Sequence, residues 1–282
     1  MKTVGMNPAQ KALWFIEGHL SGELTLDEVA VIAGVSRFHM VRAFAAATGL
    51  SVMRYVRARR LSEAARALAG GAPDILRVAL DADYGSHEAF TRAFREHFGV
   101  TPDAVRAQGR LDTLKLQEPI IMDSTLLDKL APPRFETTKP FLVAGLGERY
   151  SFETTAGIPG QWQRFNEQRH EIPDQVGGMA YGVCCNGDDS GNFDYIAGGE
   201  VSDFSDLPRK FARVRIPEAR YAVFSHREHV STIRRTVNTI WNQWLPASGL
   251  IVADAPNFER YDEQFDPRTG NGGFEIWIPV KG

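Results

Sequence analysis

The chain has 282 residues, of which 43% are hydrophobic and 24% charged, a composition that suits a soluble globular protein of about two domains. No run approaches the roughly 18 consecutive apolar residues that a membrane helix needs, and the start lacks the apolar stretch of a signal peptide, so we expect a cytoplasmic protein. Cys184 and Cys185 are adjacent and are the only cysteines, which excludes a disulfide framework that joins distant segments.

The net charge of −3 conceals a difference between two parts of the chain. Residues 1–110 carry 14 Lys and Arg against 11 Asp and Glu, whereas residues 111–282 carry 18 against 24. The first part is therefore basic and the second acidic. A charge of +3 is only a weak indication of a nucleic-acid partner, so the arrangement of the residues has to show whether this part of the chain binds DNA.

Residues 1–110 have the apolar spacing of short helices with glycines at their ends. The capping box of Thr25 and Glu28 predicts a helix that ends at Gly34, and Ser36 then caps the next helix. This order predicts a helix-turn-helix unit.

A repeat with an offset of 50 residues predicts a second unit of the same kind, since residues 36–44 recur as 86–94. The preceding helix starts at Asp74, and Asp83 tolerates the left-handed backbone that the turn needs. In each copy one helix face is apolar and the opposite face carries an arginine, Arg42 or Arg92. A reader of the DNA major groove requires this combination.

We call the helices that carry Arg42 and Arg92 the first and the second reader. Residues 52–69 predict one continuous helix capped by Ser51, about 27 Å long, which could hold the two readers about one DNA turn apart. Four of its arginines are expected to form a solvated face with some contact to phosphates: Arg54, Arg57, Arg59 and Arg60. After the second reader, Thr101 and Pro102 start a last short helix.

After a predicted linker over residues 111–133, the residue pattern changes from that of helices to that of strands. Residues 141–146, 180–185 and 220–225 predict strands, and helices are expected around Trp162 and around Trp241. Two copies of a strand-helix-strand-strand unit, and therefore an α+β domain, follow from this order.

The motif from Tyr84 to Phe94, followed by Gly99 to Pro102, resembles the AraC/XylS family of transcription factors. The resemblance covers about residues 8–108 and implies that base-facing side chains lie on both readers. Val41 departs from the polar residues common in the family and suits contact with a thymine methyl group. The expected DNA-binding residues are Arg37, Phe38, Val41, Arg42, His87, Glu88, Thr91 and Arg92.

The remainder of the chain resembles the GyrI-like effector-binding domain, on the residues 258–262 and 274–280. The resemblance implies an aromatic cleft with an acidic residue that binds small and often cationic molecules. The expected ligand-binding residues are Glu259, Tyr261, Trp277, Glu275 and Tyr181. Both glutamates alternate with apolar residues, so simple exposure to solvent is the competing interpretation.

The expected fold class is thus an all-α double helix-turn-helix domain followed by an α+β GyrI-like domain. The expected boundaries are 1–110 for the DNA-binding domain, 111–133 for the linker and 134–282 for the effector-binding domain.

The sequence predicts a DNA-binding transcriptional regulator that a small molecule controls. Its expected partners are promoter DNA, an effector of cationic and aromatic character, and RNA polymerase, with no membrane and no cofactor. Two alternatives remain for the second domain. It could hydrolyse small molecules with Glu259 and either Tyr261 or Tyr181, or it could bind a protein. We expect no enzyme, because no nucleophile-base or metal arrangement stands out.

Two segments that resemble metal sites have simpler interpretations. Residues 186–191 lack the later glutamate of a calcium loop and predict a hairpin turn. His226 and His229 lack further ligands nearby, so we expect no metal there.

Overall fold

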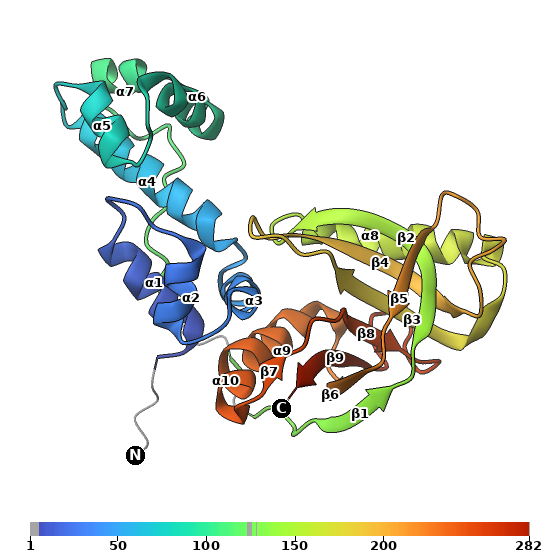
Figure 1. The fold of residues 1–282 in the computed structure, drawn as a ribbon. Coiled ribbons are helices and arrows are strands. Elements are labelled where there is room, and N and C mark those ends of the chain that lie inside the picture. Colours follow the sequence, from blue (N-terminus) through green and yellow to red (C-terminus); the bar gives the residue numbers. More distant parts are fainter. Residues whose placement is uncertain (1–5, 123–125, 128, 282) are drawn as a thin grey trace. The chain divides into compact units, whose positions relative to one another are not determined.

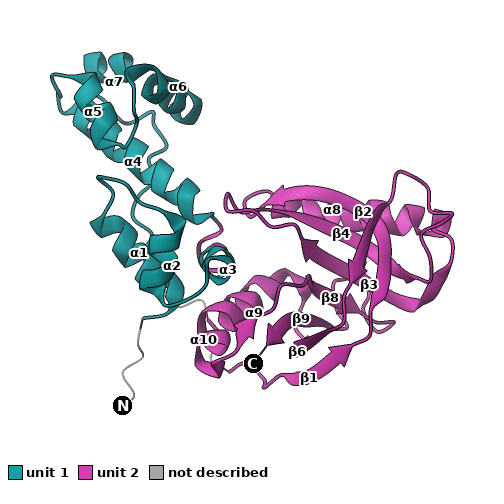
Figure 2. Cartoon of the chain, viewed as in Figure 1, with its two compact units in different colours: residues 1–44, 50–123 teal, residues 45–49, 124–282 magenta. Residues whose placement is uncertain are grey.

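The structure, a computed structural model, describes residues 6–122, 126–127 and 129–281, and the chain forms two compact units (Figures 1 and 2). The first unit comprises residues 1–44 and 50–123, and the second comprises residues 45–49 and 124–282. Within the described residues, no single helix is both long and apolar enough to cross a membrane.

The first part of the chain is helical, as predicted. Its helices are α1 (Pro8–Gly18), α2 (Leu26–Ala33), α3 (Arg37–Thr48), α4 (Val52–Ala69), α5 (Ile75–Asp81), α6 (His87–Phe98) and α7 (Pro102–Gln108). The pairs α2–α3 and α5–α6 are the two predicted helix-turn-helix units, and α4 is the predicted continuous helix between them (Figure 1).

Local signals set most of these helix ends. The backbone N–H of Thr25 donates to Glu28 Oε2 at 2.8 Å and the N–H of Glu28 donates to Thr25 Oγ1 at 3.3 Å, so the predicted capping box is confirmed. Asp83 has a φ of 66°, as the turn before α6 requires. Ser51 is the N-cap residue of α4, as predicted, but its buried Oγ makes no capping hydrogen bond and has no hydrogen-bond partner among the described residues.

Helix α4 belongs to the cores of both helix-turn-helix units. Near its start, the ring of Tyr55 lies 5.7 Å from that of Phe44 in α3. The second half of α4 packs into a core with the second helix-turn-helix unit. This core contains Leu61, Ala64, Ala65, Leu68, Ile75, Val78, Ala79, Ala82, Phe90, Phe94 and Val105. Each reader is therefore anchored to a different half of the same rod.

The segment after α7 runs back along α4. Leu111, Leu114 and Leu116 pack against the second core. Farther on, the N–H of Gln117 donates to Ser62 Oγ at 2.8 Å, and the N–H of Ile120 donates to the hydroxyl of Tyr55 at 3.1 Å. The part of the predicted linker that precedes residue 123 is thus attached to the first unit.

The second unit is an α+β domain. Its strands are β1 (Arg134–Thr138), β2 (Phe141–Ser151), β3 (Gln175–Cys185), β4 (Asn192–Val201), β5 (Ala212–Ile216), β6 (Ala219–His226), β7 (Ile251–Val252), β8 (Asn257–Tyr261) and β9 (Phe274–Lys281). Its helices are α8 (Ile158–Gln168), α9 (Ile233–Thr239), a π-helical turn (Ile240–Trp244) and α10 (Leu245–Ser248), with short 3-10 turns at Thr155–Gly157, Arg169–Glu171 and Val230–Thr232.

The strands form one antiparallel sheet in the order β1-β6-β9-β8-β3-β4-β2-β5, with β7 paired to β9. Two copies of the predicted strand-helix-strand-strand unit are present, β2-α8-β3-β4 and β6-α9-β8-β9, and they meet where β3 pairs with β8. The edge strands β1 and β5 had no counterpart in the sequence analysis. Only Pro217 and Glu218 separate β5 from β6, which lies near the opposite end of the sheet, so the sheet must curl.

The two faces of the sheet have separate cores. On one face, Phe193, Tyr195 and Ala197 of β4 pack with Phe165 of α8. The opposite face, inside the curl, carries a second core that includes Val143, Tyr181, Ile196, Tyr221, Phe258 and Trp277. Because side chains alternate along a strand, neighbouring residues on β8 belong to different cores.

Candidate functional site

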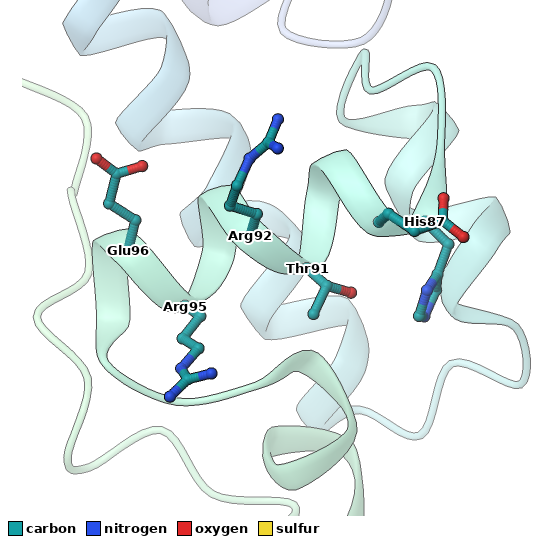
Figure 3. A pocket seen from close by; sticks show the side chains of 6 residues that line it. His87, Thr91, Arg92, Arg95 and Glu96 are labelled. Carbon is teal, nitrogen blue, oxygen red and sulfur yellow. The ribbon is translucent and has the colours of Figure 1, made fainter.

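The second reader helix, α6, is anchored by one face and open on the other. Ser86 Oγ accepts a hydrogen bond from the N–H of Ala89 at 3.1 Å, which caps the helix, and Phe90 and Phe94 are buried. Six side chains of α6 line a shallow hollow of about 680 Å³, shown in Figure 3: His87, Glu88, Thr91, Arg92, Arg95 and Glu96. The structure therefore brings all four residues predicted on this helix to one surface.

Positively and negatively charged side chains both lie at this surface. Hydrogen bonds from its own backbone N–H and from Ser86 hold the pKa of Glu88 below its usual range, so its carboxylate is ionised at neutral pH. Arg92 and Arg95 are exposed. The Oγ1 of Thr91 is enclosed without a hydrogen-bond partner among the described residues. The surface can donate from arginine and accept on glutamate, as base edges in a major groove require.

The first reader helix, α3, presents fewer exposed candidates. Arg37 forms an ion pair with Asp27 at 2.9 Å, and both side chains are exposed. Phe38 is 41% exposed, whereas Val41 and Arg42 are only 9% and 8% exposed. The guanidinium of Arg42 lies 5.6 Å from the centroid of the Phe38 ring.

The prediction of a solvated arginine face on α4 holds for Arg54 and Arg57, which are exposed, and is wrong for Arg59 and Arg60. Arg59 donates to Glu17 at 2.8 Å and to Glu63 at 2.9 Å. Carboxylates and backbone carbonyls around these two guanidinium groups replace the water that burial removes.

In the second unit, a carboxylate lies among aromatic side chains on the helix-covered face of the sheet. Glu259 Oε2 accepts hydrogen bonds from the hydroxyls of Tyr195 at 2.7 Å and Tyr261 at 3.0 Å. Trp162 of α8 donates from Nε1 to the Tyr195 hydroxyl at 3.0 Å, and its ring meets that of Tyr261 edge to face at 5.1 Å. We call Glu259, Tyr195, Tyr261 and Trp162 the Glu259 cluster.

A glycine makes room for the Glu259 cluster. Gly182 on β3 pairs with Glu259 on β8, and a Cβ added at Gly182 would lie 2.1 Å from the Tyr195 hydroxyl and 2.5 Å from Glu259 Oε2. No side chain larger than hydrogen fits there without displacing these oxygens. The close approach of three polar groups thus depends on this glycine.

The environment changes the pKa values of the cluster. Burial raises the pKa of Glu259, while the two tyrosine hydrogen bonds oppose this rise without cancelling it. Burial and the neighbouring Glu259 carboxylate raise the pKa values of Tyr195 and Tyr261 well above the ordinary range. At neutral pH the tyrosines are therefore hydrogen-bond donors.

The other residues predicted for the ligand site lie on the opposite face of the sheet. Tyr181 and Trp277 belong to the core inside the curl. Glu275 accepts from the indole Nε1 of Trp277 at 3.0 Å and forms ion pairs with Arg134 at 2.6 Å and Arg260 at 2.7 Å. The structure brings Glu259 and Tyr261 together and separates them from this second group.

Sequence reasoning missed Tyr195, Trp162 and Gly182. Trp162 was predicted only to lie on a helix, whereas it is half-buried and donates a hydrogen bond to the Tyr195 hydroxyl of the cluster. Tyr195 lies on β4 between Phe193 and Ala197, so strand alternation could have placed it on one face. Only the pairing of β3 with both β4 and β8 shows that this is the face of Glu259.

The two segments considered for metal binding have structural roles. Residues 186–191 connect the antiparallel strands β3 and β4, so the predicted hairpin turn is confirmed. His226 Nδ1 lies 2.9 Å from Thr236 Oγ1, and His229 Nε2 lies 2.9 Å from the carbonyl oxygen of Thr269. Within the described part of the chain, no group of three or more His, Cys, Asp or Glu side chains could hold a metal ion.

Comparison with known proteins assigns a family to each unit. Residues 131–281 match the GyrI-like small molecule binding domain, and residues 29–108 match a helix-turn-helix domain. Transcriptional regulator Rob of Salmonella typhimurium is 26% identical over 95% of this chain and 96% of Rob. Transcriptional regulator BrlR of Pseudomonas aeruginosa is 31% identical over 48% of this chain and 51% of BrlR. The solved structure of SAV2435 bound to tetraphenylphosphonium is 21% identical, covers 54% of this chain and 95% of that chain, and has a TM-score of 0.46.

The two family matches follow the two predicted domains in the same order. The GyrI-like match covers more than half of the chain, and the helix-turn-helix match extends from α2 to the end of α7. The two helix-turn-helix units on one connecting helix have the AraC-type arrangement. The chain therefore belongs to the transcriptional regulators that combine an AraC-type helix-turn-helix DNA-binding domain with a GyrI-like small molecule binding domain.

Proposed function

We propose that the second unit binds an organic cation at the Glu259 cluster and that this binding controls transcription from promoters recognised by α3 and α6. The observation that carries the proposal is the half-buried carboxylate that lies among aromatic rings. Both tyrosines donate to Oε2, and Oε1 has no hydrogen-bond partner among the described residues. A bound cation would restore the favourable electrostatics that burial removes, and aromatic faces attract cations.

The two groups of predicted ligand residues receive different roles in this proposal. Glu259 and Tyr261 bind the ligand together with Tyr195 and Trp162. Glu275, Trp277 and Tyr181 stabilise the opposite face, where ion pairs and ring stacking already engage the first two.

For DNA we propose that α6 reads bases with His87, Glu88, Thr91 and Arg92. Arg92 suits a guanine and the ionised Glu88 suits the amino group of a cytosine. On α3 the proposed contacts are Arg37, Phe38, Val41 and Arg42.

The proposed domains are residues 1–110 for DNA binding, 111–133 for the connection and 134–282 for effector binding. RNA polymerase is the proposed protein partner and the cytoplasm the proposed location. Sensing is favoured over hydrolysis because both tyrosine hydroxyls already donate to the Glu259 carboxylate and because the matching family is a small molecule binding domain.

The test is calorimetric titration of the full-length protein with tetraphenylphosphonium and with its neutral relative triphenylphosphine oxide. Glu259→Gln keeps the size of the side chain and removes its charge. We expect it to weaken cation binding by at least about tenfold, more than the roughly 0–1 kcal/mol of an exposed ion pair, and to leave the neutral compound unaffected.

Glu275→Gln is the matched control, because it removes the same charge from the opposite face of the same sheet. It should leave cation affinity unchanged. A wild-type protein that binds no organic cation, or equal losses in the two variants, would contradict the assignment of the ligand site.

A further inference from the structure

A buried arginine in the middle of α4 connects the two helix-turn-helix units. Arg60 is only 9% exposed, and its guanidinium donates three hydrogen bonds to groups outside α4. Nε donates to the carbonyl oxygen of Leu20 at 2.8 Å and Nη2 to that of Gly22, both in the loop between α1 and α2. Nη1 donates to Asp83 Oδ2 at 2.6 Å, in the turn between α5 and α6.

Backbone geometry presents two of the acceptors to this arginine. Gly22 has a φ of 109° and Asp83 a φ of 66°, both in the left-handed region that most side chains avoid. A guanidinium is planar, with its donors at fixed angles, so acceptors on two loops define how these loops lie around it. Burying its charge is costly unless each donor is satisfied, which favours a single arrangement.

The position of Arg60 along α4 gives this contact a mechanical consequence. The first reader packs against the start of α4 and the second reader against its second half. Rotation of one core against the other about the axis of α4 would change the distances between α4 and the loops of the two helix-turn-helix units. A side chain that bonds to a loop beside each core opposes such rotation.

We propose that Arg60 is a positioning residue that fixes the distance and rotation between α3 and α6, and thereby the spacing between the two DNA boxes that the protein accepts. This inference rests on the proposed function, because it requires both readers to bind DNA. One extra base pair moves the second box by about 3.4 Å and turns it by roughly 35°, since a helical turn holds about 10–10.5 base pairs. A braced pair of readers cannot follow this change, whereas a pair without the brace can.

The neighbouring residue Arg59 provides a matched control. It is 4% exposed and bonds to Glu17 in α1, to Glu63 in α4 and to the carbonyl oxygen of Gln117. None of these partners lies in the α5–α6 turn. Its loss should lower stability without releasing the second reader.

The experiment measures how affinity depends on box spacing. A duplex enriched from a random DNA pool by the full-length protein is remade with one base pair removed, and with one or two added, between the boxes. Wild type and Arg59→Met should each lose about tenfold in affinity when the spacing changes by one base pair. Arg60→Met should bind all spacings within about threefold of one another.

A second variant and a stability measurement protect the test from a folding defect. Asp83→Gly suits the left-handed backbone and removes the carboxylate partner of Arg60, so it should flatten the spacing profile as Arg60→Met does. Urea unfolding shows whether each variant is folded.

The outcomes separate this inference from the proposed function. If wild type binds two boxes and the folded Arg60→Met and Asp83→Gly variants keep tenfold discrimination, the positioning role is wrong and the proposed function stands. If wild type enriches no two-box sequence, DNA reading by both helices is wrong, and the positioning role is overturned with it.

Discussion

Two opposing effects act on the carboxyl group of Glu259. Burial disfavours the charged form and raises its pKa, whereas the Tyr195 and Tyr261 hydroxyls stabilise the charged form. The net pKa is raised, so this glutamate takes up a proton at a higher pH than an exposed one, whose pKa is about 4.3. The charge that would attract a cation is therefore lost at a higher pH than the charge of an exposed glutamate.

This shift predicts a pH dependence of effector binding. Affinity for tetraphenylphosphonium, whose charge does not titrate, should be complete above the raised pKa of Glu259 and should fall as the pH drops through it. Calorimetric titrations from pH 8 towards pH 5 measure the effect. Glu259→Gln should bind equally weakly across this range, and a variant that retains the wild-type slope would assign the titration to another group.

The two reader helices differ at the residue scale despite their repeated sequence. Arg92 is exposed at the surface that α6 presents, whereas Arg42 at the matching position of α3 is buried. The repeat predicts matching backbone positions. The exposure of each arginine side chain depends on the residues that pack around its helix, and the repeat in the sequence does not specify these neighbours.

At the scale of helices and strands, local chemistry made the ends of several elements predictable. The capping box at Thr25, the left-handed turn at Asp83 and the continuous helix α4 are all present. Each depends on residues within a few positions of one another. The edge strands β1 and β5 have five residues each and pair at the ends of the sheet, so their local pattern is weak.

The proposed ligand site could be predicted only in part, for a related reason. Alternation correctly put Glu259 beside Tyr261 and Glu275 beside Trp277 within their own strands. The register between β8 and β9 pairs Arg260 with Glu275, which puts the two glutamates on opposite faces. Arg59 and Arg60 were misjudged similarly, because their carboxylate and carbonyl partners lie at least 20 residues away, apart from Glu63.

The segment after α7 supports a prediction about the extent of the DNA-binding domain. A fragment of residues 1–122 keeps Leu111, Leu114 and Leu116 in the second core, and a fragment of residues 1–110 loses them. Three half-buried leucines contribute about 3 kcal/mol, so the longer fragment should be more stable by about that amount. Urea unfolding of both fragments measures the difference, and equal stabilities would show that the segment adds nothing to this fold.

On the scale of the whole molecule, the chain divides its chemistry between its two parts. The basic part carries the reader helices and the acidic part carries the Glu259 cluster. The family matches assign DNA binding to the first and small-molecule binding to the second. Control of transcription by a small molecule requires both parts, and it requires first that the DNA-binding part recognises its promoter sequence.

Sequencing the DNA that the purified full-length protein retains from a random pool tests whether the two helix-turn-helix units read bases. We expect two boxes with centres about 10–10.5 base pairs apart, one turn of the duplex. With Arg92→Ala, preference at one base pair of one box should disappear, with a loss of about 1–3 kcal/mol in specific binding. Retained DNA without any shared sequence, or an unchanged preference in Arg92→Ala, would contradict base reading by α6.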